Sequence, residues 1–115
     1  MNIDIKWERK AGVLIAMPSG SIDSISAPGF QSVLESGIDP GDRALVLDAE
    51  QVSFIGSAGI RIFLNLARKF DASGKQFGIC ALSGPIRNVI TMGGFDKIIS
   101  VYDSQAEAID AFKSS

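Results

Sequence analysis

A serine flanked by small residues is the feature of this sequence best suited to chemistry. Ser57 lies between Gly56 and the pair Ala58 and Gly59, and an amphipathic pattern begins directly after it. Because the first backbone N–H groups of a helix have no partner within the helix, a hydroxyl in the first turn lies near unpaired donors. A helix start also favours a negatively charged group. The sequence therefore predicts an exposed serine at which a phosphate could be accommodated.

The chain contains no histidine, the side chain most often used as a general base near neutral pH. A triad of serine, histidine and acid cannot form, and Ile55 stands where the nucleophile elbow of hydrolases needs a glycine. With no histidine and one cysteine, a zinc site is not expected. No Walker or dinucleotide-binding glycine pattern occurs. These observations predict a protein that is not an enzyme and that has no cofactor or metal.

Length and composition predict a single globular domain spanning residues 1–115. The 11 basic and 13 acidic side chains give a net charge of -2, and the cations are scattered, so nucleic acid is not an expected partner. The single cysteine, Cys80, lies in an apolar run, which predicts a buried thiol in a reducing compartment. The longest apolar run, Val13 to Met17, is too short for insertion into a membrane. We therefore expect a cytoplasmic protein.

Hydrophobic periodicity predicts an α/β fold, with a mixed, mostly parallel sheet of about five strands and about four helices in the order β-β-α-β-α-β-α-β-α. The first strand, around residues 3–8, is expected at an edge of the sheet. The second is expected to stop at Pro18, and the third to end at Asp48. Each helix is expected to bury one apolar face. The first would bury Phe30, Val33 and Leu34, and the second the stripe from Ile60 to Phe70. The third would bury Ile86, Val89 and Ile90, and the last Ile109 and Phe112.

The aromatic residues and the methionines are expected to pack in the core. Trp7 and the phenylalanines each fall on an apolar stripe or alternation, and Met17 and Met92 are expected to fill gaps.

The helix that begins at Ser57 and the segment around Asp23 each follow the end of a strand. Open α/β sheets usually present their sites at such ends.

The ordered set of these motifs resembles a STAS domain of the bacterial anti-sigma factor antagonist family, over nearly the whole chain. Gly20, Ile22 and Asp23 resemble the glycine, hydrophobe and acid that follow the second strand of that family. The resemblance continues in the third strand, the phosphorylation loop and two later segments, which correspond here to residues 46–48, 54–60, 80–82 and 92–95. The resemblance implies a single STAS-like domain.

The resemblance also implies partner switching. An anti-sigma factor with serine kinase activity would bind the unphosphorylated protein, and phosphorylation of Ser57 would end that binding, so that sigma-factor-dependent transcription is regulated. A serine phosphatase would reverse the modification. The implied partner-binding residues are Asp23, Ser24, Gly56, Ser57, Ala58, Gly59, Ile60 and Arg61.

Two positions depart from the family pattern. Gly56 replaces the acid that usually precedes the serine, and Arg61 stands where relatives commonly carry a small residue. Residues four apart share a helix face, so Arg61 could compensate charge at a phosphate on Ser57.

Other interpretations of the same residues remain open. Ser57 could be only a helix cap, and Asp23 could cap the first helix through an Asx-type contact. The chain could instead be a STAS subunit that is never phosphorylated and is docked in a larger assembly, such as a lipid-transport ABC system. A small-molecule binding module is a third class, for which no polar constellation is recognisable.

Overall fold

The computed structural model describes residues 3–113, which form one sheet with four α-helices. None of the helices in this range is long and apolar enough to cross a membrane. In chain order the elements are β1 (Asp4–Lys10), β2 (Val13–Ile22), α1 (Ala27–Gly37), β3 (Ala44–Asp48), β4 (Gln51–Ile55), α2 (Ser57–Ala72), β5 (Gln76–Cys80), α3 (Gly84–Met92), the short 3-10 helix η1 (Phe95–Lys97), β6 (Ser100–Tyr102) and α4 (Gln105–Lys113).

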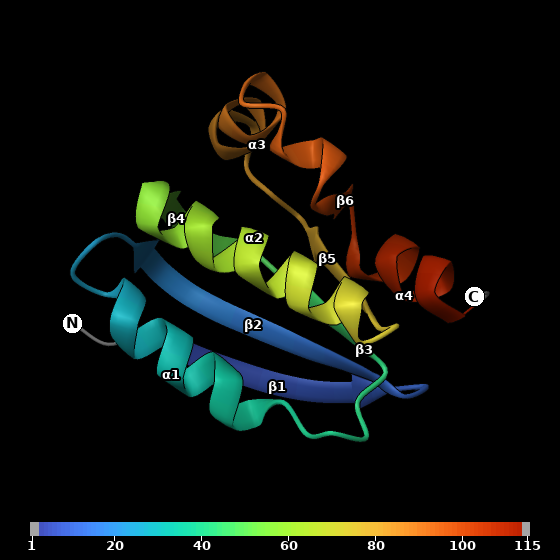
Figure 1. Cartoon of the computed structure of the whole chain (residues 1–115). Coiled ribbons are helices and arrows are strands. Elements are labelled where there is room, and N and C mark those ends of the chain that lie inside the picture. The colour runs from blue at the N-terminus through green and yellow to red at the C-terminus, as the bar shows by residue number, and fades with distance from the viewer. Residues whose placement is uncertain (1–2, 114–115) are drawn as a thin grey trace.

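The sheet has the strand order β1-β2-β3-β5-β6, and β4 pairs with the carboxyl-terminal part of β2 (Figure 1). Strand β1 is antiparallel to β2 and lies at the edge, and the other pairs are parallel. The mixed, mostly parallel sheet with an edge strand at its start is thus confirmed. The difference is the sixth strand, β4, because the sequence patterns predict no strand between Asp48 and Gly56.

Strand β2 continues to Ile22, so the prediction that it stops at Pro18 is wrong. On one side, β2 pairs with β3 through residues 13–16 and with β4 through residues 19–22. Pro18 lies between these two pairings, where its missing N–H interrupts neither ladder. The proline therefore marks the point at which β2 changes neighbours.

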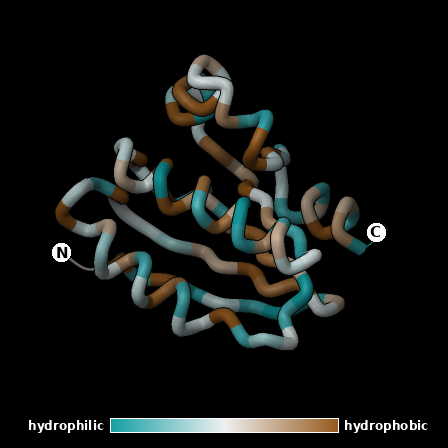
Figure 2. The backbone as a smooth tube through the Cα atoms, in the orientation of Figure 1, coloured by the Kyte–Doolittle hydropathy of each residue, from teal (hydrophilic) through white to brown (hydrophobic). Residues whose placement is uncertain are grey.

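Apolar side chains fill both faces of the sheet, in two clusters of unequal size. The larger cluster joins one sheet face to α1 and α2 through residues such as Phe30, Leu45 and Phe63. The smaller cluster joins the other face to α4 and includes Cys80 and Phe112. The tube in Figure 2 is accordingly hydrophobic along the first half of β2 and paler toward its carboxyl end. Burial raises the pKa of the Cys80 thiol to about 12, consistent with the predicted buried cysteine.

Three helix positions that the sequence assigns to the core are exposed. Val33 on α1 and Val89 and Met92 on α3 have exposed fractions of 41%, 52% and 87%. Phe30, Leu34, Ile86, Ile90 and Phe112 are buried as expected, and Ile109 is partly buried. The predicted apolar stripes are therefore wider than the surfaces that these helices bury.

A buried carboxylate fastens the edge strand to the loop after α1. Asp42 accepts hydrogen bonds from Nε of Arg9 at 2.9 Å and from the backbone N–H of Asp39 at 2.9 Å. The guanidinium of Arg9 also donates to the carbonyl of Gly37 at 3.3 Å. The hydrogen bond from Arg9 lowers the pKa of Asp42 below its ordinary value. This end of the molecule lies opposite the carboxyl ends of β2 and β4.

We expect Asp42→Asn to lower the free energy of unfolding by about 1–2 kcal/mol at pH 7, since it weakens hydrogen bonds to a charged donor. Because the folded-state pKa of Asp42 is depressed, its stabilisation is complete above the ordinary aspartate pKa of about 4 and is lost as the pH falls below it. Urea unfolding at pH 7 and pH 3 measures both effects. Asp39→Asn is the control, because Asp39 is a more exposed partner of Arg9 than Asp42 is. It should lower the free energy of unfolding less than Asp42→Asn does. Equal pH dependence in Asp42→Asn and the parent protein would contradict this prediction.

Candidate functional site

The carboxyl ends of β2 and β4 bring the two predicted site segments together. Ile22 and Ile55 are paired in the last position of the parallel ladder. The N–H of Gly56 then donates to the carbonyl of Ile22 at 2.8 Å, which extends the contact by one residue. The segment that begins at Asp23 and the start of α2 at Ser57 are consequently adjacent at the same edge of the sheet.

Asp23 organises the loop that leads into α1. One oxygen of its carboxylate accepts from the N–H groups of Ile25 at 3.0 Å and Ser26 at 2.9 Å. The Ser26 hydroxyl donates in turn to the carbonyl of Ser21 at 2.7 Å. The hydrogen bonds from the backbone of Ser26 and Ile25 lower the pKa of Asp23. Asp23 therefore makes an Asx-type contact, but within the loop before α1: the N-cap residue of α1 is Ser26, and no side chain caps that helix. A partner-binding role for Asp23 stays a prediction.

Ser57 is the first residue of α2 and is exposed. Gly56 occupies the N-cap position with extended backbone, and no side chain caps the helix. The interpretation of Ser57 as only a helix cap is therefore wrong. Its hydroxyl lies in the first turn, where backbone N–H groups of a helix lack internal partners.

Gly56 and Gly59 are both explained by close approaches. A Cβ atom at Gly59 would lie 2.8 Å from Cγ2 of Ile22 and 3.0 Å from Cγ2 of Ile55, so glycine lets the first turn of α2 rest on both strands. A Cβ atom at Gly56 would lie 3.2 Å from the ring of Phe54. The glycine that replaces the family acid thus leaves room for that ring.

The predicted contact residues divide into exposed and buried ones. Ser24, Ser57 and Arg61 are exposed, and Ala58 is partly buried. Gly59 and Ile60 are buried within the domain, where they pack α2 against the sheet, and a partner contact by them stays a prediction. Ser24, Ala58 and Arg61 line a shallow hollow of about 240 Å³ between the starts of α1 and α2.

The sequence patterns do not predict two exposed hydrophobic side chains beside this site. Ile25, in the loop after β2, has an exposed fraction of 79%, and Phe54, near the end of β4, has one of 52%. The expected core position of Phe54 is therefore wrong. The pairing of β2 with β4 shifts by one residue so that Ser53 is bulged, and the bulge breaks the alternation that would have turned Phe54 inward. A large apolar residue in a loop of serine and aspartate was the available signal for Ile25.

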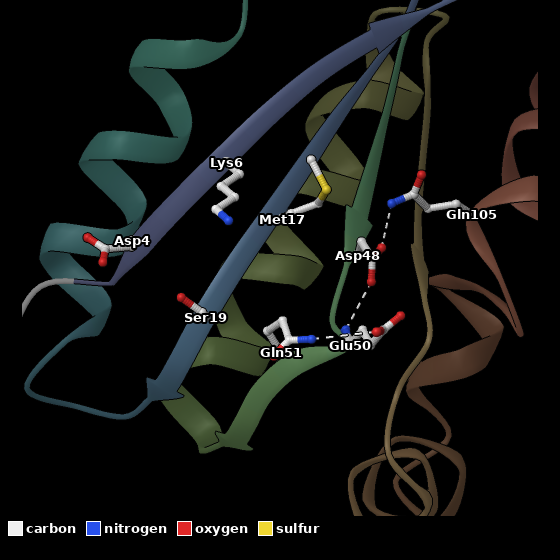
Figure 3. A pocket seen from close by; sticks show the side chains of 8 residues that line it. All are labelled: Asp4, Lys6, Met17, Ser19, Asp48, Glu50, Gln51 and Gln105. Atoms are coloured by element: carbon white, nitrogen blue, oxygen red, sulfur yellow. Dashed lines mark hydrogen bonds between the residues drawn. The ribbon is translucent and has the colours of Figure 1, made fainter.

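A separate hollow of about 530 Å³ lies on the sheet face that α1 and α2 do not cover (Figure 3). There the carboxylate of Asp48 accepts from Nε2 of Gln105 at 2.5 Å and from the N–H of Glu50 at 2.9 Å, joining β3 to α4. The hollow contains none of the predicted site residues. Its lining has mixed charge and consists of Asp4, Lys6, Met17, Ser19, Asp48, Glu50, Gln51 and Gln105.

The chain is similar to known proteins over nearly its whole length. Residues 4–108 match the model of the STAS domain. BtrV of Bordetella bronchiseptica, whose name assigns it provisionally to the anti-sigma factor antagonists, is 33% identical over 104 residues, 90% of each chain. The crystal structure of an anti-sigma factor antagonist from Mycobacterium paratuberculosis has a TM-score of 0.83 at 29% identity, covering 96% of this chain and 94% of that one.

The anti-sigma factor antagonist SpoIIAA shares the fold. Its structure in the unphosphorylated form has a TM-score of 0.76 at 18% identity and covers 97% of this chain and 98% of that one. Its phosphorylated form has a TM-score of 0.68 at 19% identity, covering 94% and 98%. Sequence, topology and fold agree with the motifs around Asp23 and Ser57: this chain belongs to the STAS domain family.

Proposed function

We propose that this protein is an anti-sigma factor antagonist that acts by partner switching. Its unphosphorylated form binds an anti-sigma factor with serine kinase activity, and phosphorylation of Ser57 ends that binding. The observation that carries the proposal is the exposed Ser57 in the first turn of α2, adjacent to the Asp23 loop. The names of the relatives supply the class of partner.

The surface around Ser57 is suited to a protein partner rather than to a small substrate. Ile25 and Phe54 present exposed apolar side chains, one in the loop after β2 and the other near the end of β4. Apolar side chains of this kind supply much of the binding energy in protein interfaces. The protein is thus a regulator whose action is binding, with a serine phosphatase restoring the binding form.

Phosphorylation would change this surface strongly. A phosphate adds a charge of about -1.5 to -2 at pH 7. Enclosing that charge against a partner beside Ile25 and Phe54 would remove it from water, which is unfavourable unless cations compensate it. Loss of binding requires no unfolding, because Ser57 is exposed and its hydroxyl caps no helix.

The test is the intact mass of the protein recovered from its native cells, together with Ser57→Ala and the control Ser53→Ala at an exposed serine of β4. We expect a phosphorylated fraction in the parent and in Ser53→Ala that is absent in Ser57→Ala. The unphosphorylated parent should bind an anti-sigma factor of those cells at least 10-fold more tightly than the phosphorylated form, a difference of about 1.4 kcal/mol. Absence of phosphate under all growth and stress conditions would contradict the proposal and favour a subunit docked in a larger assembly.

A further inference from the structure

Arg61 lies one helical turn after Ser57 on the exposed side of α2. Residues four apart on a helix are neighbours on its surface, and both of these side chains are exposed. Long helical side chains lean toward the amino terminus of their helix. The guanidinium of Arg61 is therefore within reach of the turn that contains Ser57.

Arg61 forms no ion pair with another side chain in the described part of the chain. The ion pairs found between residues 3 and 113 involve Arg9, Lys10 and Arg87. The first turn of α2 contains no acidic residue. The adjacent loop supplies the carboxylate of Asp23, which is held by the backbone of that same loop.

The surroundings of Arg61 leave room for an anion. Its side chain lines the hollow of about 240 Å³ that Ser24 and Ala58 also border. The two small side chains leave the space beside the first turn open. Ser57 is not among the residues that line this hollow, but it precedes Ala58 in the same turn of α2. A tetrahedral group on Ser57 would lie one helical turn from the guanidinium of Arg61 and next to the backbone N–H groups of the helix start.

We propose that Arg61 binds the phosphate of phosphorylated Ser57 within the same chain. The proposal rests on the proposed function, which supplies the phosphate. Phosphorylation then changes two parts of the surface at once, because it adds the phosphate and withdraws Arg61 from any contact with the partner. Arg61 is a positioning residue of the switch, and it holds the modified serine close to its own helix.

The second ionisation of phosphoserine reports this contact directly. We would install phosphoserine at position 57 of the full 115-residue chain by genetic code expansion and titrate it by phosphorus NMR. A neighbouring guanidinium favours the doubly charged form, so Arg61→Gln should raise the second pKa of the phosphate by about 0.3–0.7. Arg61→Lys keeps the charge but loses the planar guanidinium, which can donate two parallel hydrogen bonds to a phosphate. It should therefore raise the second pKa of the phosphate less than Arg61→Gln does.

Arg68→Gln is the matched control. Arg68 is an exposed cation on the same helix, seven residues beyond Arg61 and about 10 Å farther along the axis. At 0.15 M salt that is more than one Debye length, so this substitution should leave the second pKa unchanged. Raising the salt to 1 M should also reduce the difference between Arg61→Gln and the parent.

Equal second pKa values in Arg61→Gln and the parent, or an equal change in Arg68→Gln, would overturn the inference. All variants replace an exposed side chain, and circular dichroism verifies their folding. Because the phosphoserine is installed during synthesis, the titration needs no kinase. Failure to find phosphate in native cells would refute the proposed function, whereas an unchanged titration would refute the role of Arg61 alone.

Discussion

Phe63→Ala is expected to lower the free energy of unfolding by about 3–5 kcal/mol. The Phe63 side chain of α2 is fully buried, and its ring meets that of Phe30 on α1 edge to face, with 6.2 Å between ring centroids. Alanine would leave a cavity between the two helices and remove this aromatic contact. The helices carry the Asp23 loop and Ser57 at their starts, so the same substitution should loosen the site.

Urea unfolding followed by circular dichroism measures the loss of stability in Phe63→Ala. Phe63→Leu keeps most of the buried volume and is the matched variant, with an expected loss of about 1.5 kcal/mol or less. A loss below 1 kcal/mol in Phe63→Ala would show that the space between α1 and α2 collapses, contrary to the packing described here.

Phe54→Ala is expected to weaken binding to the anti-sigma partner by about 2 kcal/mol, or roughly 30-fold, with little change in stability. The ring is half exposed near the end of β4, two residues before the turn at Gly56, and an aromatic side chain at the centre of an interface is a common source of binding energy. Calorimetric titration with the purified anti-sigma factors of the native cells measures this effect.

Ile98→Ala provides a control for Phe54→Ala. Ile98 has a similar exposed fraction, 49%, but it lines a hollow with Asp71 and Lys75, beside the carboxyl-terminal part of α2. We expect Ile98→Ala to bind as the parent does. Equal weakening in the two variants would mean that the partner covers both ends of α2, and unchanged binding in Phe54→Ala would contradict the placement of the interface.

Most of the architecture could be predicted from local patterns. The strand at Val13 to Met17 and the start of α2 at Ser57 each have a strong local signal, and the structure contains both. Ser104 and Glu107 also have the spacing of a capping box, and it is present in part at the start of α4, since the hydroxyl of Ser104 accepts from the N–H of Glu107 at 3.2 Å. The carboxylate of Glu107 accepts from the N–H of Asp103, one residue earlier than the motif requires.

The differences arise where pairing between distant segments decides the outcome. Pro18 stands inside β2 because β2 exchanges β3 for β4 there, which no local pattern reveals. Phe54 is exposed because of the bulge at Ser53, and alternation along the strand alone predicts the opposite. For the site, sequence placed Ser57 and Arg61 on the surface, whereas the burial of Gly59 and Ile60 depends on how tightly α2 rests on β2 and β4.

The bulge at Ser53 also has a consequence for self-association. Strand β4 pairs only with β2 within residues 3–113, so its other side has no neighbouring strand. A straight, apolar strand in that position would be a template for the corresponding strand of another molecule, and so a starting point for aggregation. A bulged strand is twisted and offers an interrupted row of hydrogen-bonding groups. The irregularity that exposes Phe54 therefore also makes β4 a poor template for strand-to-strand assembly.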